Sequence, residues 1–320
     1  MSRYWRCLAA VLLSLCTIGM ASAQQYPSKP LRVLLPYPPG GSTDTFTRII
    51  TQKLSEALGQ PVVVDNRPGG NTIIGTDLAA KAPADGYTFI LVASTYAINP
   101  SLFKLPYDPN KDLIPIIQAG FSTLVLVVHP SLPPKTLKEF LAYAKANPGK
   151  LNYGTVGSGS ITHLASELFA DEAGISTVNV PYKGTAPMLT DLLGGQLQFA
   201  LDTPVTSIPH IKSGKLRPIA VSSAKRLGAL PEVPTMAEAG LPFEINAWLG
   251  FLAPAGTPKE IVQRLNAEIN KILQMPDVRE KLAAAALEPG GGTPEQFGAV
   301  IKADLARWPA VVKKAGVKVD

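Results

Sequence analysis

Cysteine is nearly absent from this chain. The only two among 320 residues are Cys7 and Cys16, and both lie in the first 23 residues, which we predict below to be removed. The remaining chain has no thiol, so we expect neither a disulfide nor a cysteine-bound metal. Lipid attachment at Cys16 is disfavoured because Leu15 precedes it, where a small residue is expected. Stability must therefore come from an apolar core, which about 300 residues can build.

Residues 1–23 have the three parts of a secretory signal peptide. Two arginines precede the apolar stretch 8–20, and the small residues Ala21-Ser22-Ala23 follow it. A charged start, a short apolar stretch and a small-residue cleavage pattern are typical of such peptides. We therefore predict cleavage before Gln24 and a mature protein in the periplasm.

Long apolar runs and dense basic clusters are also missing. The stretch 8–20 is shorter than the roughly 20 residues that span a bilayer, and no later run reaches about 18. The formal net charge is +6, but the longest basic run is Lys313-Lys314, so we expect no nucleic-acid partner. With 46% hydrophobic and 17% charged residues, the composition excludes a disordered chain, a coiled coil and a collagen-like fibre.

Motifs for catalysis and for cofactor or metal binding are missing as well. The three histidines, His129, His163 and His210, are isolated and lack metal-ligand spacing. Gly157-x-Gly159 is followed by Thr162 where a dinucleotide fingerprint needs a third glycine, and neither a P-loop nor a Gly-x-Ser-x-Gly elbow occurs. We expect no catalytic residue, no cofactor and no metal, and the chain is not expected to be an enzyme. Only His163, which follows a glycine-rich turn, stays open between a structural and a catalytic role.

Proline is abundant, at 30 of 320 residues against a usual share of about 5%. It separates short apolar runs that alternate with stretches of helical periodicity, which predicts an α/β fold with parallel sheets. Capping boxes at Thr136, Thr257 and Thr293 predict three helix starts. Residues 258–316 are expected to be helical only. The apolar runs predict buried strands at 31–35, 61–65, 88–93, 124–128, 151–155, 177–180, 197–201 and 216–221.

The irregular, proline-rich segment 99–115 separates two α/β units. If the last helices pack back on the first sheet, the first lobe consists of residues 24–123 and 248–320. The second lobe is then 124–247. The chain would cross between the lobes twice.

Two glycine-rich turns stand where a predicted strand runs into a helix, at residues 36–44 and 156–163. Such turns let backbone N–H groups approach an anion, and the helix N-terminus adds positive potential. Ordinary turns capped by serine or threonine are the alternative. Because ligands in open α/β sheets bind at the carboxyl ends of strands, the pair favours a cleft for a small anion. Asp202, at the end of a predicted strand, is either a cleft residue or an end-of-strand cap.

The chain resembles a known family, the substrate-binding receptors of tripartite tricarboxylate transporters, often called Bug-type receptors. The resemblance covers essentially the whole mature chain in the same motif order. Its most specific pieces are Pro36-Tyr37-Pro38-Pro39-Gly40-Gly41 and Pro181-Tyr182-Lys183-Gly184. The other matching segments are 26–30, 42–44, 64–70, 84–88, 97–102, 151–154, 163–165, 230–235 and 252–258.

The resemblance implies a type II periplasmic-binding-protein fold, in which two α/β lobes with two crossover connections enclose a cleft. In the family, backbone amides and ordered waters from the two glycine-rich turns hold ligand carboxylates. Tyr96 departs from the family, where histidine is frequent. The residues expected to bind the ligand are Tyr37, Pro39, Gly40, Gly41, Ser42, Thr43, Asp44, Ser94, Thr95, Gly157, Ser158, Gly159, Thr162, His163, Tyr182, Lys183, Gly184, Asp202 and Thr203.

The implied function is capture of a small carboxylate by a periplasmic, monomeric receptor that delivers it to the membrane permease of a tripartite tricarboxylate-type transporter. An extracytoplasmic receptor that presents its liganded form to a sensor kinase is the alternative. Lys183 is either a charge partner of the ligand or a solvated loop lysine. Across the family the cargo includes dicarboxylates, citrate-like acids, amino acids and aromatic acids, and the sequence does not choose among them.

Overall fold

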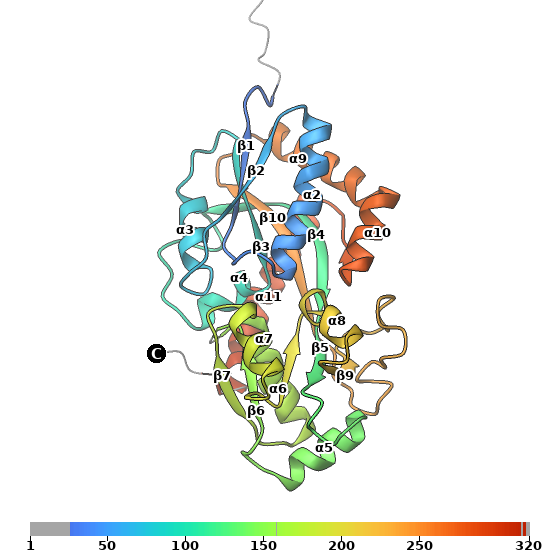
Figure 1. The fold of residues 1–320 in the computed structure, drawn as a ribbon. Helices are drawn as coiled ribbons and strands as arrows, with labels where there is room; N and C mark the ends of the chain where they lie inside the picture. The colour runs from blue at the N-terminus through green and yellow to red at the C-terminus, as the bar shows by residue number, and fades with distance from the viewer. Residues whose placement is uncertain (1–25, 158, 315, 318–320) are drawn as a thin grey trace, which may run out of the picture.

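The computed structural model describes residues 26–157, 159–314 and 316–317, which form two α/β lobes (Figure 1). The predicted signal peptide and Ser158 lie outside the described residues. The first lobe contains β1 (Leu31–Leu35), α2 (Ser42–Leu58), β2 (Val62–Asn66), α3 (Ile73–Ala80), β3 (Thr88–Ala93), α4 (Thr95–Ile98), η1 (Asn99–Ser101), β4 (Leu113–Thr123), β10 (Asn246–Pro254), α9 (Lys259–Gln274), α10 (Pro276–Ala284), β11 (Leu287–Pro289) and α11 (Pro294–Lys314). The second contains β5 (Val125–Val128), α5 (Leu137–Ala146), β6 (Asn152–Thr155), α6 (Ile161–Ala173), β7 (Val178–Pro181), α7 (Thr185–Leu193), β8 (Phe199–Asp202), α8 (Pro204–Lys212) and β9 (Arg217–Val221).

Each lobe is built on a mixed sheet, so the prediction of parallel sheets was only partly right. The strand orders are β11-β4-β10-β3-β1-β2 and β7-β6-β8-β5-β9. β1, β2 and β3 are parallel, as are β6, β7 and β8, but β10 runs antiparallel to β3 and β4, and β5 to β8 and β9. The antiparallel strands stand next to the connections between the lobes, where the chain enters or leaves a sheet without a crossover helix.

Three strands of the first sheet were not predicted. β4 contains Pro115, Gln118 and Gly120, which interrupt its apolar pattern, and β10 is broken by Gly250. β11 contradicts the prediction that residues 258–316 are helical only. It has three residues and pairs with β4 over a long sequence distance, so no local periodicity could indicate it.

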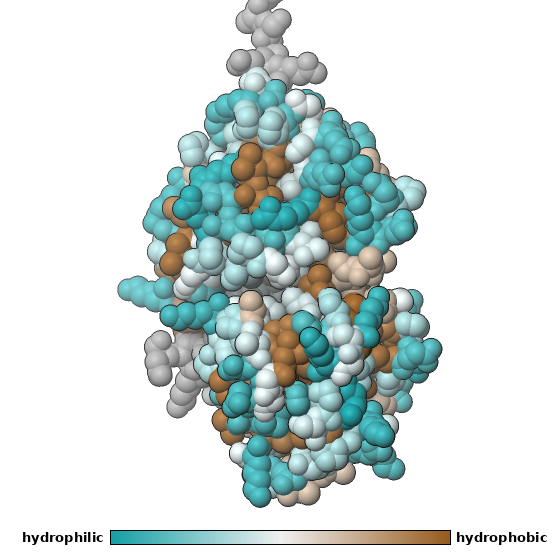
Figure 2. Space-filling view, viewed as in Figure 1, coloured by the Kyte–Doolittle hydropathy of each residue, from teal (hydrophilic) through white to brown (hydrophobic). Residues whose placement is uncertain are grey.

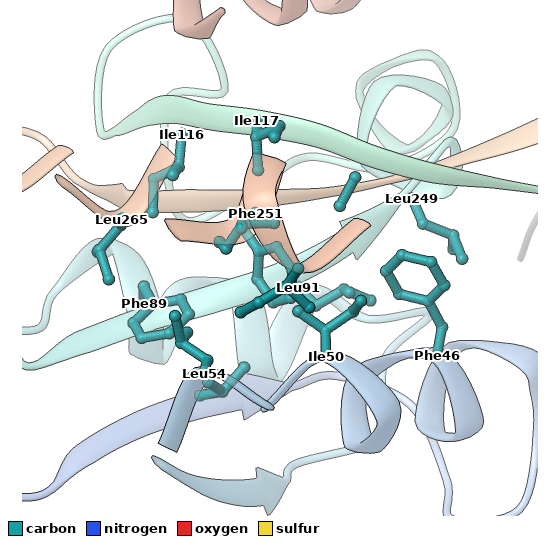
Figure 3. Packing of buried hydrophobic residues seen from close by; sticks show 14 of the residues in the cluster. Phe46, Ile50, Leu54, Phe89, Leu91, Ile116, Ile117, Leu249, Phe251 and Leu265 are labelled. Carbon is teal, nitrogen blue, oxygen red and sulfur yellow. The ribbon is translucent and has the colours of Figure 1, made fainter. Parts of the chain in front are cut away.

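The core of the first lobe confirms the helical pattern predicted over residues 46–58. Phe46, Ile50 and Leu54 are fully buried on one face of α2. Figure 3 shows them pointing toward Phe89 of β3 and Phe251 of β10. Burial of each such side chain contributes about 1.5–3 kcal/mol, so this face fixes α2 on its sheet and with it the turn that precedes the helix.

Two of the three predicted capping boxes are present. Thr136 and Glu139 exchange hydrogen bonds at the start of α5, and Thr293 and Gln296 do so before α11. The third prediction was wrong: α9 begins at Lys259 without a side-chain cap. The Thr257 hydroxyl instead donates to the Pro254 carbonyl at 2.7 Å, because the local turn brings that acceptor closer.

The two connections between the lobes are hydrogen-bonded to each other through Ser222. Its buried hydroxyl accepts the Leu124 N–H at 3.0 Å and donates to the Ile245 carbonyl at 2.7 Å. Leu124 joins β4 to β5, and Ile245 precedes β10. The fully buried Ser222 side chain therefore links the two connections between the lobes.

Among the described residues, no helix is long and apolar enough to cross a membrane.

Replacing Gly250 by alanine should destabilise the first lobe. A Cβ at this position of β10 would lie 2.2 Å from Cζ of Phe297, which packs from α11, and 2.9 Å from the Ile117 carbonyl. Overpacking of this kind costs about 1–3 kcal/mol. Urea unfolding should show this loss for Gly250→Ala and not for Gly228→Ala, whose Cβ would meet nothing within 4 Å. Equal stability of the two variants would contradict the packing described.

Candidate ligand-binding site

The two lobes place corresponding turns at the same topological position. β1 lies between β2 and β3 in the first sheet, and β6 lies between β7 and β8 in the second. In each sheet the next two strands along the chain therefore pair on opposite sides of β1 or β6. Open α/β sheets bind ligands at the carboxyl ends of strands where the strand order reverses in this way. The predicted residues follow the carboxyl ends of these strands, and Figure 2 shows pale residues of intermediate hydropathy gathered where the lobes meet.

The first turn leaves the N-terminus of α2 uncapped. Its N-cap is Gly41, without a side chain to accept a hydrogen bond, so the alternative of a serine or threonine cap does not hold. The N–H groups of Ser42, Thr43 and Asp44 have no partner within the described part of the chain. Gly40 adopts φ +86°, a conformation that favours glycine and bends the chain into the helix. Together these amides form a set of unpaired donors at a positive helix end.

Asp44 stabilises this turn. Its carboxylate accepts the Gly40 N–H at 3.1 Å, the Asn66 amide at 3.1 Å and the Arg48 guanidinium at 3.0 Å. Burial acts to raise the pKa of Asp44, but the hydrogen bonds from Arg48, the Gly40 amide and Asn66 outweigh it and hold that pKa below its usual value. The carboxylate therefore stays ionised and orders the turn through its hydrogen bond from the Gly40 N–H.

The second turn is largely satisfied by its own side chains. The Gly159 N–H donates to Nδ1 of His163 at 3.0 Å, and the His163 N–H donates to the Ser160 hydroxyl at 3.3 Å. The Thr162 hydroxyl accepts the Val156 N–H at 3.3 Å. His163 thus has a structural role here, and its Nε2 lies 3.1 Å from the Asn179 amide. Of the first turn of α6, the N–H groups of Ile161 and Thr162 have no partner among the described residues.

A third turn, at Tyr182–Gly184, also presents unpaired N–H donors, at the start of α7. Gly184 is the N-cap of α7, at φ +119°, and makes no side-chain cap bond. The N–H groups of Thr185 and Ala186 have no partner in the described ranges. A Cβ on Gly184 would lie only 3.4 Å from Cγ of Pro38, so this turn faces the first turn directly across the lobes.

The two side chains before Gly184 differ in environment. The Tyr182 hydroxyl donates to Asp191 at 2.6 Å, and burial together with this carboxylate raises the pKa of Tyr182 to about 12. Lys183 is exposed and forms no ion pair with the described residues.

Asp202 and Thr203 organise the start of α8. The Thr206 and Ser207 hydroxyls donate to one oxygen of Asp202 at 2.7 and 2.6 Å. Asp202 is 1% exposed, and burial raises its pKa despite these hydrogen bonds. The sequence left two roles open for Asp202, a cleft residue and an end-of-strand cap. These contacts favour the cap. Thr203 is the N-cap residue of α8, and its hydroxyl lies 3.1 Å from that of Thr206.

The residues at the end of β3 and just after it are buried and make structural contacts. The Ala93 N–H donates to the Tyr37 hydroxyl at 3.1 Å, and the Ser94 hydroxyl accepts the Trp248 N–H at 3.0 Å. Thr95 is 4% exposed. Tyr96, the departure from the family, is buried in the core, where its hydroxyl donates to the Pro109 carbonyl at 2.8 Å. Its side chain is therefore committed to the lobe interior.

Asn71 was not among the residues predicted from the sequence to bind the ligand. This residue follows the Gly69-Gly70 pair, has φ +50° and is half-buried. A Cβ on Gly157 would lie 3.9 Å from Oδ1 of Asn71, so the side chain spans the gap to the second lobe. An asparagine after two glycines could have indicated a left-handed position, since asparagine tolerates it better than most residues.

No group of three or more histidine, cysteine, aspartate or glutamate side chains that could hold a metal ion occurs among the described residues. The arrangement offers backbone N–H donors at three helix starts, and this donor set is suited to an anion.

Asp44→Asn should weaken the fold at neutral pH and change its acid response. Because the pKa of Asp44 is lowered in the folded state, its stabilisation is present above about pH 4 and is lost as the pH falls through the folded-state value. Loss of a charged hydrogen-bond acceptor should cost about 1.5–3 kcal/mol at pH 7. Urea unfolding from pH 7 to about pH 3 should show a smaller acid-dependent loss in the variant. Glu172→Gln, on an exposed position of α6, is the control, and an unchanged pH profile for Asp44→Asn would contradict the role given to this carboxylate.

The chain is similar to known proteins over most of its length. The profile of the family described as "Tripartite tricarboxylate transporter family receptor" matches residues 46–317. A structure described as Rpa4515 of R. palustris with adipate is 39% identical, covers 92% of this chain and 99% of its own, and superposes with a TM-score of 0.87. The periplasmic binding protein BugD is 34% identical, with 92% and 99% coverage and a TM-score of 0.85. MatC from Rhodopseudomonas palustris with bound malate is 32% identical, with 90% and 100% coverage and a TM-score of 0.82.

These relatives confirm the fold class expected from the sequence, a two-lobe periplasmic-binding-protein architecture. BugD is described as a periplasmic binding protein, and the other two structures contain the dicarboxylates adipate and malate. The family match covers most of the chain and agrees with the Bug-type resemblance in the sequence. The chain belongs to the tripartite tricarboxylate transporter receptor family.

Proposed function

We propose that this protein is a periplasmic receptor that binds a small carboxylate between its lobes and delivers it to a transport permease. The observation that carries the proposal is the pair of uncapped helix starts facing each other across the lobes, α2 after Gly41 and α7 after Gly184. Each presents N–H groups without a partner in the described residues, and Pro38 and Gly184 bring the two turns into contact. A bridging anion would satisfy donors from both lobes at once.

The donor strengths are sufficient for such a complex without an arginine. A hydrogen bond to a charged group contributes about 1.5–3 kcal/mol, and a helix N-terminus adds about 0.3–1 kcal/mol. Micromolar affinity requires about 8 kcal/mol, so a few bonds from α2 and α7 reach this range before ordering costs. Lys183 is exposed and is not needed as a charge partner.

The cargo that fits best is a small dicarboxylate. Relatives at 39% and 32% identity hold adipate and malate. The site presents donors in both lobes, so one carboxylate can be held at each side or one can bridge them. No nucleophile–base pair emerged from the sequence, and His163 is engaged by Gly159, so a binding role is favoured over a catalytic one.

Removing a single N–H from either helix start should weaken carboxylate binding. Ser42→Pro and Thr185→Pro place proline at the first helical position, where its ring is tolerated and its missing N–H breaks no helical bond. The preceding glycines have ψ of 178° and 173°, which proline accepts. Each variant should bind succinate, malate or adipate about 10- to 100-fold more weakly by calorimetry.

Ser42→Ala and Thr185→Ala are the matched controls, because they remove the same hydroxyls and keep the N–H. They should bind within a few-fold of the unmodified protein. If only Ser42→Pro weakens binding, α7 does not contact the ligand, and the proposal of a site formed by both lobes is wrong. If no small carboxylate binds the unmodified protein, the proposed function fails.

The receptor should be exported and processed. Intact-mass measurement of the periplasmic protein should give a chain beginning at Gln24, because Ala21-Ser22-Ala23 forms a cleavage pattern. Detection of a chain that retains residues 1–23, or that carries acyl groups on Cys16, would contradict this maturation.

A further inference from the structure

Residues Gly69, Gly70, Asn71 and Thr72 form a run of left-handed backbone with φ of +130°, +53°, +50° and +75°. Two of these residues carry side chains, and such conformations persist only where the surroundings hold them. A Cβ on Gly75, just beyond the run, would lie 2.8 Å from Cβ of Pro36, so the segment packs beside the first turn. It stands at the same edge of the sheet as the unpaired donors of α2.

The buried Asn99 holds this segment and fixes the orientation of the Asn71 amide. Asn99 is fully buried, and its Nδ2 donates to the Asn71 backbone carbonyl at 2.8 Å and lies 3.2 Å from the Thr72 hydroxyl. A carbonyl can only accept, so Nδ2 of Asn99 is the donor and its Oδ1 must be an acceptor. That oxygen lies 2.8 Å from the Asn71 side chain, which therefore turns its NH₂ group to Asn99. The outward atom of Asn71 is thus its amide oxygen.

The outward oxygen of Asn71 faces the second lobe. A Cβ on Gly157 would lie 3.9 Å from it. At the same edge of the first sheet, the N–H groups of Ser42, Thr43 and Asp44 at the start of α2 have no partner among the described residues. Oδ1 of Asn71 is therefore a fixed hydrogen-bond acceptor at the boundary between the lobes, where the proposed site presents donors.

We propose that Asn71 selects, among small carboxylates, those that also carry a hydrogen-bond donor, as 2-hydroxy and 2-amino acids do. This inference rests on the proposed function, since the carboxylate is held by the helix starts. A hydroxyl or ammonium group of the ligand donates to Oδ1 of Asn71, whereas a plain dicarboxylate leaves that oxygen unpaired on closure. Malate, held by the relative at 32% identity, carries such a hydroxyl, and adipate, held by the relative at 39% identity, does not.

The test compares matched acids on two variants. Calorimetry is run with succinate, malate and aspartate, and with adipate, 2-hydroxyadipate and 2-aminoadipate. Asn71→Gly removes the acceptor and keeps the left-handed backbone, which alanine would strain. Asn110→Gly, in the loop before β4, is the control, and circular dichroism checks that each variant is folded.

The unmodified protein and Asn110→Gly should bind the hydroxy or amino member of a series about 3- to 10-fold more tightly than the plain acid. Asn71→Gly should lose that preference while it still binds the plain acid. The inference is overturned if the unmodified protein has no such preference, or if Asn71→Gly keeps it. It is also overturned if Asn71→Gly weakens all acids equally, because Asn71 would then hold the lobes together through Gly157. The preference of the unmodified protein can refute the inference by itself, so the test does not depend on whether a variant folds. Absence of binding by every acid would instead refute the proposed function.

Discussion

The proposed binding site depends on which helices leave their first backbone N–H groups without a hydrogen-bond acceptor. Every α-helix begins with N–H groups that have no helical acceptor, and side chains, water or ligands supply one. At α5 and α11 a threonine and an acidic or amide side chain do so. At α2 and α7 the N-cap is glycine and no side chain does so among the described residues. These two helices start at the boundary between the lobes, so their unmet donors define the site that we propose.

The rest of the molecule holds these donors in place. Phe46, Ile50 and Leu54 pack α2 against the first sheet. The ionised Asp44 forms an ion pair with Arg48 and accepts a hydrogen bond from the Gly40 N–H, which orders the turn before the helix. Ser222 forms hydrogen bonds to both connections between the lobes. A ligand that bridges the helix starts would then favour one arrangement of the lobes over others.

Much of this arrangement could be predicted from the sequence. The strands at 31–35 and 88–93 were predicted with their observed bounds, because each is a continuous apolar run between turn residues. β4, β10 and β11 were missed, because prolines and glycines interrupt two of them and the third depends on distant pairing. The glycine-rich turn before α2, which belongs to the proposed site, could be predicted as a strand-to-helix turn from its composition. The hydrogen bond from Gly159 to His163 before α6, and the approach of Pro38 to Gly184 before α7, depend on contacts that no local pattern encodes.

The most direct test follows the backbone amides themselves. In a ¹⁵N-resolved NMR titration with malate, the amide signals of Ser42, Thr43 and Asp44 should shift together with those of Thr185 and Ala186, at one common dissociation constant. The Gly159 amide, already bonded to His163, should shift less. Shifts confined to α2, or a larger response at Gly159 than at Thr185, would contradict a carboxylate held between the starts of α2 and α7.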